Sequence, residues 1–275
     1  MDNVIYYDGT VASDPSNEKF LHNEFGVNYR FGKLGLNASA YNTDWQDRNL
    51  TKSVTTGQGS SGDTDIIFLT GVNQKHQGLE LETNYMVNDM LDLMFVASFG
   101  NWKFDGDADG TYQETEYNSE GQAVGFQTTE YAYALDGLYV GDMPQTAYVL
   151  GVTLKPVKGL SLQAIHKTYD KNYSDWSPSA REFDGTNDDA DRSQVWEAPG
   201  YSKLDLHMSY KLPTIKGLDM MLTGHIFNVL DEVYVQDAVD NSQYNSWGTK
   251  EHLAHNAEVF LGTPRYANIG LTINF

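Results

Sequence analysis

The chain closes with YANIGLTINF, residues 266–275, a stretch that alternates strictly in character. The apolar positions are Ala267, Ile269, Leu271, Ile273 and Phe275. Polar or small residues fill every position between them. Because successive side chains of a β-strand point to opposite faces, the stretch predicts a strand with one apolar face and one wet face. Such a strand needs an apolar environment on one side only.

The same alternation recurs along most of the sequence. In one example, Leu79 and Leu81 alternate with Glu80 and Glu82. Helical periodicity is scarce, so the pattern predicts an all-β, antiparallel protein. We expect nine long strands, at about 18–31, 34–54, 65–87, 90–104, 145–157, 159–176, 200–213, 217–237 and 258–275.

The connections between these strands alternate between short and long. Tight turns are expected around residues 32–33, 87–90, 156–159 and 213–217. Long polar loops are expected at about 55–64, 105–144, 177–199 and 238–257. This asymmetry is typical of transmembrane β-barrels of the outer membrane, which have short periplasmic turns and long extracellular loops. Strands of about 9–11 residues suffice to cross a bilayer, so the longest ones should project beyond it.

Composition excludes several classes of protein. The 18 basic and 38 acidic residues give a net charge of −20, which argues against a nucleic-acid partner. There is no cysteine, so disulfides and thiolate chemistry are excluded. No apolar run approaches the roughly 20 residues of a membrane-spanning helix. The opening residues, MDNVIYYDGT, do not form a signal peptide.

A barrel in lipid must close, because free backbone edges cannot face hydrocarbon. If the last of nine antiparallel strands ends in the periplasm, the first strand must also run from the extracellular side towards the periplasm. We therefore expect residues 1–17 to be the tail of an extracellular loop and residues 18–275 to be the C-terminal part of a barrel. The carboxylates of Glu80 and Glu82 should then line the lumen.

Six segments together resemble the C-terminal barrel portion of TonB-dependent outer-membrane receptors. They are NEKFLHNEFGVNYRF (17–31), LGLNASAYNTDWQDRNL (34–50), NQKHQGLELETNY (73–85), YSKLDLHMSYKL (201–212), GHIFNVLDEVYV (224–235) and GTPRYANIGLTINF (262–275). The resemblance implies that the strands correspond to the last nine of a 22-stranded barrel, without the plug domain. It also implies that the barrel assembly machinery reads the apolar residues of 267–275.

The resemblance implies a receptor in the outer membrane of a Gram-negative cell, in contact with outer-membrane lipid. Such a receptor takes up a scarce small nutrient, such as a ferric siderophore or cobalamin, and depends on the TonB complex where the N-terminal plug is present. We expect no enzymatic activity, because no nucleophile elbow, phosphate loop or catalytic Ser/His pattern occurs. The alternative is a secreted soluble β-protein that binds glycans with calcium.

One acidic segment matches the spacing of a calcium-binding loop. In DGDADGTYQETE, residues 105–116, the ligand positions are Asp105, Asp107, Asp109 and Glu116, with a glycine at the sixth position. This spacing predicts Ca²⁺ binding in an extracellular loop, although no cofactor is required for the receptor function. The alternative is an ordinary solvated loop tip.

Aromatic residues fall into two expected groups. Those near strand ends are interpreted as interface anchors, because barrels carry aromatic girdles: Trp45, Trp102, Tyr169, Tyr173, Trp176 and Tyr234. Those in loops are candidate ligand contacts, with packing between loops as the alternative: Tyr112, Tyr117, Phe126, Tyr131, Tyr133, Trp196, Tyr244 and Trp247. Among the histidines, His207 should face the lumen, and both His207 and His225 are expected to be structural. His252 and His255 are expected to be ordinary loop residues.

Overall fold

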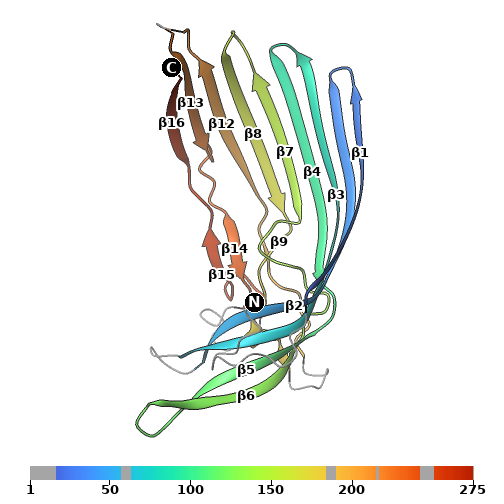
Figure 1. Ribbon diagram of the computed structural model, residues 1–275, viewed down its shortest axis with the longest axis vertical. Helices are drawn as coiled ribbons and strands as arrows, with labels where there is room; N and C mark the ends of the chain where they lie inside the picture. Colours follow the sequence, from blue (N-terminus) through green and yellow to red (C-terminus); the bar gives the residue numbers. More distant parts are fainter. Residues whose placement is uncertain (1–16, 57–62, 184–189, 215–216, 242–250, 275) are drawn as a thin grey trace.

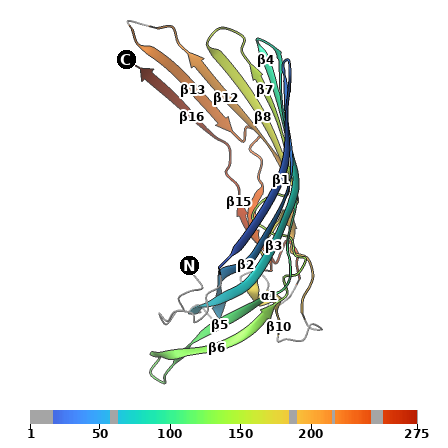
Figure 2. The same cartoon turned by 45° about the vertical axis from the view of Figure 1, so that its right-hand side comes forward.

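Nine long antiparallel strands form one curled sheet in the computed structural model (Figures 1 and 2). The structure describes residues 17–56, 63–183, 190–214, 217–241 and 251–274. The nine strands, in their order across the sheet, are β1 (Lys19–Phe31), β2 (Leu34–Thr56), β3 (Asp63–Asn88), β4 (Leu91–Phe104), β7 (Thr146–Leu154), β8 (Leu160–Asp170), β12 (Tyr201–Lys211), β13 (Asp219–Phe227) and β16 (Tyr266–Asn274). The prediction of nine barrel strands is confirmed.

The convex face of this sheet is apolar because the strand register aligns every alternating pattern. Phe95 lies opposite Thr83 on β3 and Leu150 on β7. At the far edge, Leu222 lies opposite Leu271. These side chains have no second layer over them within the described residues, and Ile269 is 82% exposed. An apolar face of this extent is stable where hydrocarbon covers it.

The apolar band has a sharp boundary on the side of the long loops. Asn42, Gln77 and Asn101 lie side by side on the convex face, one row beyond Leu79 and Phe99. The amide of Gln77 donates a hydrogen bond to Asn42 Oδ1 at 2.8 Å. Because this row is polar, it marks the level at which the wall leaves the hydrocarbon.

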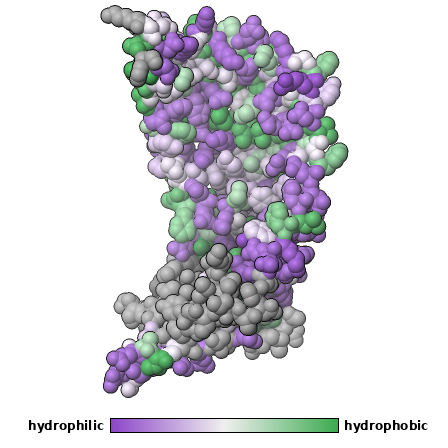
Figure 3. All heavy atoms as spheres, in the orientation of Figure 1, coloured by the Kyte–Doolittle hydropathy of each residue, from purple (hydrophilic) through white to green (hydrophobic). Residues whose placement is uncertain are grey.

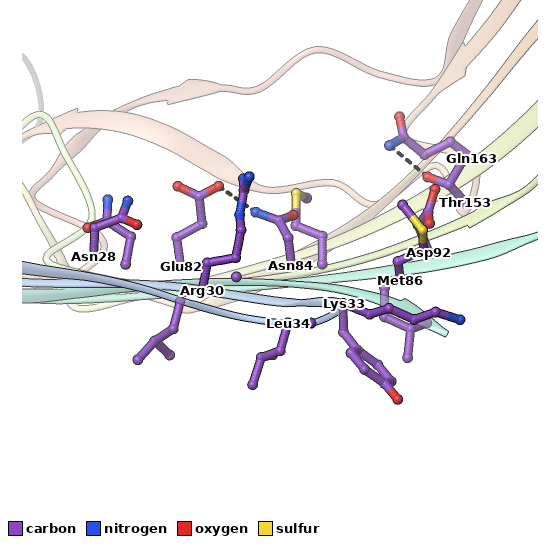
Figure 4. A pocket seen from close by; sticks show the side chains of 17 residues that line it. Asn28, Arg30, Lys33, Leu34, Glu82, Asn84, Met86, Asp92, Thr153 and Gln163 are labelled. Atoms are coloured by element: carbon purple, nitrogen blue, oxygen red, sulfur yellow. Dashed lines mark hydrogen bonds between the residues drawn. The ribbon is translucent and has the colours of Figure 1, made fainter. Parts of the chain in front are cut away.

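The concave face is polar. Figure 4 shows Asn28, Arg30, Glu82 and Asn84 on one side of the sheet, with Leu34 pointing to the other. Asn84 Nδ2 donates to Glu82 Oε1 at 2.9 Å. Figure 3 views the molecule from the same side as Figure 1, and hydrophilic or weakly polar residues cover most of the barrel strands there. The expected lumen-facing position of Glu82 is therefore confirmed.

Tight turns join the strands at one end of the sheet (Figure 1). β1 and β2 are joined by Gly32 and Lys33, and Gly32 has a φ of +56°. Gly159, which precedes β8, has a φ of +86°. L-residues with side chains rarely adopt this left-handed conformation, so glycine suits both turns. The four expected short connections all lie at this end.

The long connections carry structure of their own at the opposite end. β5 (Ala108–Tyr117) and β6 (Ala123–Tyr133) form a hairpin that pairs with the outer part of β3. The remaining short elements are β9 (Asn172–Tyr173), α1 (Pro178–Arg181), β10 (Glu182–Phe183), β11 (Glu197–Ala198), β14 (Val235–Val239) and β15 (Glu258–Leu261). Within the described residues, no helix has the length and apolar character that crossing a membrane requires.

Two expected strands prove to be shorter than their patterns. β13 ends at Phe227 and β16 begins at Tyr266, so 217–237 and 258–275 are interrupted. Asn228 has a φ of +49°, and its side chain binds both the N–H and the C=O of Glu232. This turn breaks the strand, because an asparagine tolerates the left-handed region and replaces the lost backbone hydrogen bonds.

A hydrophobic core lies beneath the loops rather than inside the barrel. Its members are buried residues of the outer β2–β3 region and of the long connections: Ile67, Leu69, Val72, Phe104, Ala108, Tyr133, Leu135, Leu138, Tyr173, Trp176 and Val195. β2 and β3 reach this core because they continue past the polar row, with bulges between Trp45 and Leu50. The expectation that the longest strands project beyond the bilayer is consistent with this arrangement.

Replacing Phe95 by Arg should destabilise the barrel by about 2–4 kcal/mol, because it places a charge on the lipid-facing side. The adjacent Val96→Arg is the matched control, since Val96 lies on the concave face opposite Glu82. Urea unfolding of the whole protein in lipid vesicles measures both. Equal losses for the two variants would contradict the assignment of faces.

Candidate functional site

An aromatic cluster covers the concave face near the loop end of β8 and β12. The ring centroids of Tyr169 and Tyr201 are 5.1 Å apart, and Tyr201 stacks on Tyr234 at 4.2 Å. Lys203 Nζ lies 4.5 Å from the Tyr234 ring centroid and donates to its hydroxyl at 3.0 Å. The cluster therefore presents flat apolar rings with a cation held against one of them.

A cavity of about 390 Å³ opens beside these rings. Phe227 and Tyr266 stack at 4.6 Å on its wall. Asp205 is buried beneath, where it accepts hydrogen bonds from Lys167 Nζ at 2.8 Å and from the Asn228 backbone N–H at 2.8 Å. Lys167 is thus balanced by a carboxylate, whereas Lys203 contacts aromatic faces.

A second aromatic cluster lies on the concave face of β2–β4. Trp102 Nε1 donates to the Tyr41 hydroxyl at 2.8 Å, and His76 stacks on Trp102 at 5.6 Å. Arg48 lies over the Trp45 ring, 3.7 Å from its centroid. Arg48 also donates to Gln74 Oε1 at 2.7 Å. Both clusters occupy the mouth of the concave face, beside the loops.

The interpretation of the strand-end aromatics as membrane anchors is wrong. The pairing register places Trp45, Trp102 and Tyr169 on the concave face. Tyr173 and Trp176 belong to the core under the loops, and Tyr234 is buried in the first cluster. Neighbouring residues of a strand point to opposite faces. The position of an aromatic residue near a strand end therefore did not show whether its side chain lies on the convex or the concave face.

A buried ion cluster ties the long loops together. The Arg181 guanidinium is fully buried and donates to Asp240 Oδ2 at 3.3 Å and to the Ser193 carbonyl at 2.5 Å. His252 bridges two carboxylates, with Nδ1 2.5 Å from Asp240 Oδ2 and Nε2 2.9 Å from Asp191 Oδ2. The expectation that His252 is an ordinary loop residue is therefore wrong, because it joins three segments.

The charges in this ion cluster support one another. Burial by itself would lower the pKa of His252, but its hydrogen bonds to Asp240 and Asp191 raise that pKa above its usual value. Burial would raise the pKa of Asp191, yet the bond to His252 holds it low. Burial lowers the pKa of Arg181, and Asp240 opposes that effect. The two carboxylates thus raise the pKa of His252 although burial and the neighbouring Arg181 act against them.

A group of three aspartates, Asp142, Asp175 and Asp237, lies where the loops meet β2. Burial, followed by the charges of Asp175 and Asp237, raises the pKa of Asp142 to about 6. Lys52 forms an ion pair with Asp175 and partly offsets this repulsion. Asp142 therefore gains or loses its charge closer to neutral pH than an ordinary carboxylate does.

The expected calcium loop does not form. Asp109 and Glu116 lie on β5, seven residues apart and hence separated by about 23 Å at ~3.3 Å per residue. Asp107 instead binds Arg192 through both carboxylate oxygens, at 2.8 and 2.7 Å. Among the described residues, no group of three or more metal-binding side chains is present. The predicted loop conformation is wrong, and calcium binding by this segment stays a prediction.

The loop aromatics chosen as ligand contacts have different environments. Tyr117 is exposed near the tip of the β5–β6 hairpin, whereas Tyr133 is fully buried against Trp176 and is unsuited to touch a ligand. Trp196 is half-buried, and its backbone N–H donates to Asp240. The following lie on β5 or β6 with side chains outside the described part: Tyr112, Phe126 and Tyr131. Tyr244 and Trp247 lie outside the described residues.

Residues of the closing strand take the expected face. Ala267, Ile269, Leu271 and Ile273 lie opposite the convex-face residues of β13. Phe275 falls outside the described residues, as do residues 1–16 of the predicted extracellular tail.

Sequence reasoning missed Tyr201, Lys203 and Lys167 as site residues. Their alternation showed that Lys203 and Asp205 share a face. It could not show that Lys167 lies opposite Lys203 on the next strand, because only the β8–β12 register places it there.

An apolar convex face, a polar concave face, turns at one end and a structured loop layer at the other define the wall of an outer-membrane β-barrel. The TonB-dependent receptor-like β-barrel family model matches residues 5–229. The chain belongs to this family, whose barrels reside in the outer membrane. No curated protein matches the chain.

Three solved structures are similar. The copper transporter OprC matches with a TM-score of 0.55 at 15% identity, over 92% of this chain and 31% of its own. The ferric-catecholate import receptor Fiu of E. coli K12 matches at 13% identity with a TM-score of 0.32, over 98% and 47%. The ferric citrate transporter FecA matches at 10% identity with a TM-score of 0.31, over 94% and 54%. The chain thus spans about a third to a half of these receptors and transporters.

Replacing Asp240 by Ala should cost about 3–5 kcal/mol of loop stability, because it leaves the buried Arg181 guanidinium without its main counter-charge. Hydrogen exchange of residues 190–198 and 251–257 reports the loss. The exposed pair of Lys19 and Asp47 provides the control, since Lys19→Ala should cost about 1 kcal/mol or less. Similar losses for both would overturn the role of the ion cluster.

Loop protection should also depend on pH through His252. Because its folded pKa is raised, its stabilising contribution is complete below about 6.5 and is lost as pH rises through the folded value. Limited proteolysis between pH 6 and 9 should show increasing loop cleavage. His252→Gln should remove this dependence, and an unchanged profile in that variant would refute the assignment.

Proposed function

We propose that this chain forms part of an outer-membrane receptor that imports a scarce nutrient, such as a ferric siderophore or cobalamin, using energy delivered through the TonB complex. The family match supports the receptor class. The observation that carries the proposal is the division of one wall into a lipid-compatible convex face and a concave face with two aromatic clusters at its mouth. A ligand arriving from outside meets these clusters after the loops.

The chemistry of the first cluster favours a ligand with flat apolar parts and acceptor oxygens. Tyr201 offers a half-buried ring that stacks on the buried Tyr234, and Lys203 supplies a cation against these rings. Aromatic faces and a nearby cation bind such groups with little loss of conformational entropy. The overall charge of −20 disfavours a bare anion, so a chelate or cofactor with partly masked charge fits better.

The two edge strands of the sheet, β1 and β16, indicate which partners the wall requires. Within the described residues, β1 pairs only with β2 and β16 only with β13. Since lipid does not tolerate open strand edges, we infer that further strands close this wall into a ring. The apolar residues of β16 fit recognition by the barrel assembly machinery, followed by contact with outer-membrane lipid.

The alternative of a secreted soluble glycan-binding protein lacks a supporting observation. A soluble sandwich would bury the apolar sides of its strands against a second sheet. Phe25 is instead 74% exposed, in line with the rest of the convex face. The matched family and the similar structures consist of receptors and transporters, in agreement with a role without catalysis.

The whole protein should fractionate with the outer membrane and confer growth on a limiting nutrient. Cells that depend on this receptor are tested on ferric catecholate, ferric hydroxamate and cobalamin as separate sole sources. We expect growth on one source, with uptake reduced at least about tenfold in Tyr201→Ala and Lys203→Ala, since each removes about 1.4 kcal/mol or more of binding. Lys211→Ala, at the turn end of β12, is the control. The proposal would be refuted if cells with and without the receptor grew equally well on each of the three nutrient sources.

A further inference from the structure

Two histidines face each other across neighbouring strands on the concave wall. His207 on β12 lies directly opposite His225 on β13. Their Nδ1 atoms are 2.9 Å apart, and the ring centroids are separated by 5.1 Å. One Nδ1 must therefore donate a proton to the other. The two imidazole nitrogens are thus close enough to share a proton, or to bind one ion in its place.

The surroundings of the pair are polar and open. Gln163 lies opposite His207 on β8, and Asn268 lies opposite His225 on β16. These four residues form one row across four strands. A cavity of about 480 Å³ adjoins the histidines and is lined also by the hydroxyl-bearing Ser161 and Ser209. Small ligands and water can therefore reach both imidazoles from the lumen.

Packing on one side fixes the orientation of the rings. Phe227 lies 5.4 Å from His207 and 6.0 Å from His225, measured between ring centroids. Asp205 lies two positions before His207 on the same face and is already engaged by Lys167. Phe227 thus packs beside both imidazoles, and the carboxylate on this face is bound to a lysine.

The chemistry of imidazole indicates which metals would bind. Two nitrogens that lie 2.9 Å apart can both reach one ion at metal–nitrogen distances of about 2.0–2.1 Å once no proton lies between them. Imidazole is a favoured ligand for copper, nickel and zinc, and among these divalent ions copper(II) binds the most tightly.

We propose that His207 and His225 form a binding site for a late divalent transition-metal ion, with copper(II) preferred over nickel(II) and zinc(II). Binding requires the donating ring to shift its proton to Nε2, so that both Nδ1 lone pairs face the ion. Water or the amide oxygens of Gln163 and Asn268 complete the coordination. The site depends on the barrel wall alone and not on the identity of the imported nutrient.

Copper(II) titration of the whole purified protein in detergent tests this site directly. Electron paramagnetic resonance of the copper-loaded protein should show two nitrogen ligands in the equatorial plane. His207→Ala and His225→Ala should each remove one nitrogen ligand and weaken copper(II) binding at least about tenfold. Nickel(II) should bind to the wild-type protein more weakly than copper(II). His255→Ala is the matched control, because His255 lies exposed in the loop layer.

Two outcomes would overturn the proposal. One is a spectrum of the copper-loaded wild-type protein that lacks the signal of two nitrogen ligands. This test uses the wild-type protein alone, so it does not depend on whether a variant folds. The other is unchanged copper affinity when both histidines are replaced, as His207→Asn with His225→Gln, in protein whose circular dichroism shows that the β-barrel is still folded. Failure of nutrient uptake would leave this result unaffected, since the titration measures the metal alone.

Discussion

Hydrocarbon offers no hydrogen bonds, and this constraint governs the whole sheet. Each backbone group in the membrane must be paired with a neighbouring strand, so the strands can vary only in which side chains they turn outward. Between the bulges near Trp45 and the tight turns, the ladders from β1 to β16 keep a constant register, and Phe95, Leu150 and Leu271 consequently belong to one continuous apolar face. A slip by a single residue at any pair would place a polar row against lipid.

Above the polar row of Asn42, Gln77 and Asn101, the physical conditions change. Water is available on both sides there, and the sheet no longer has lipid to cover its apolar residues. The β2–β3 pair has bulges at this level, and beyond them Leu69 and Val72 of β3 pack into a separate core. The loop layer is thus held by ordinary burial, reinforced by the charged network around Arg181 and His252.

Within the barrel wall, the concave face is free of both demands. Its side chains there neither meet lipid nor belong to the core under the loops, so aromatic rings, cations and imidazoles can gather on it. The clusters around Tyr201 and Trp102 and the pair of His207 and His225 lie at different levels of the same wall. A molecule that moves along the wall would meet stacking surfaces first and metal-binding nitrogens later.

The sequence by itself determined the strand count, the polarity of each face and the end at which the tight turns lie, because alternation and turn residues are local properties. It could not determine which residues of separate strands meet. His207 and His225 are 18 positions apart, and Asp240 and Asp191 lie on different loops, so register and loop packing alone bring them together. The loop conformation that the calcium spacing implied was wrong for the same reason, since pairing with β6 places Asp109 and Glu116 on an extended strand.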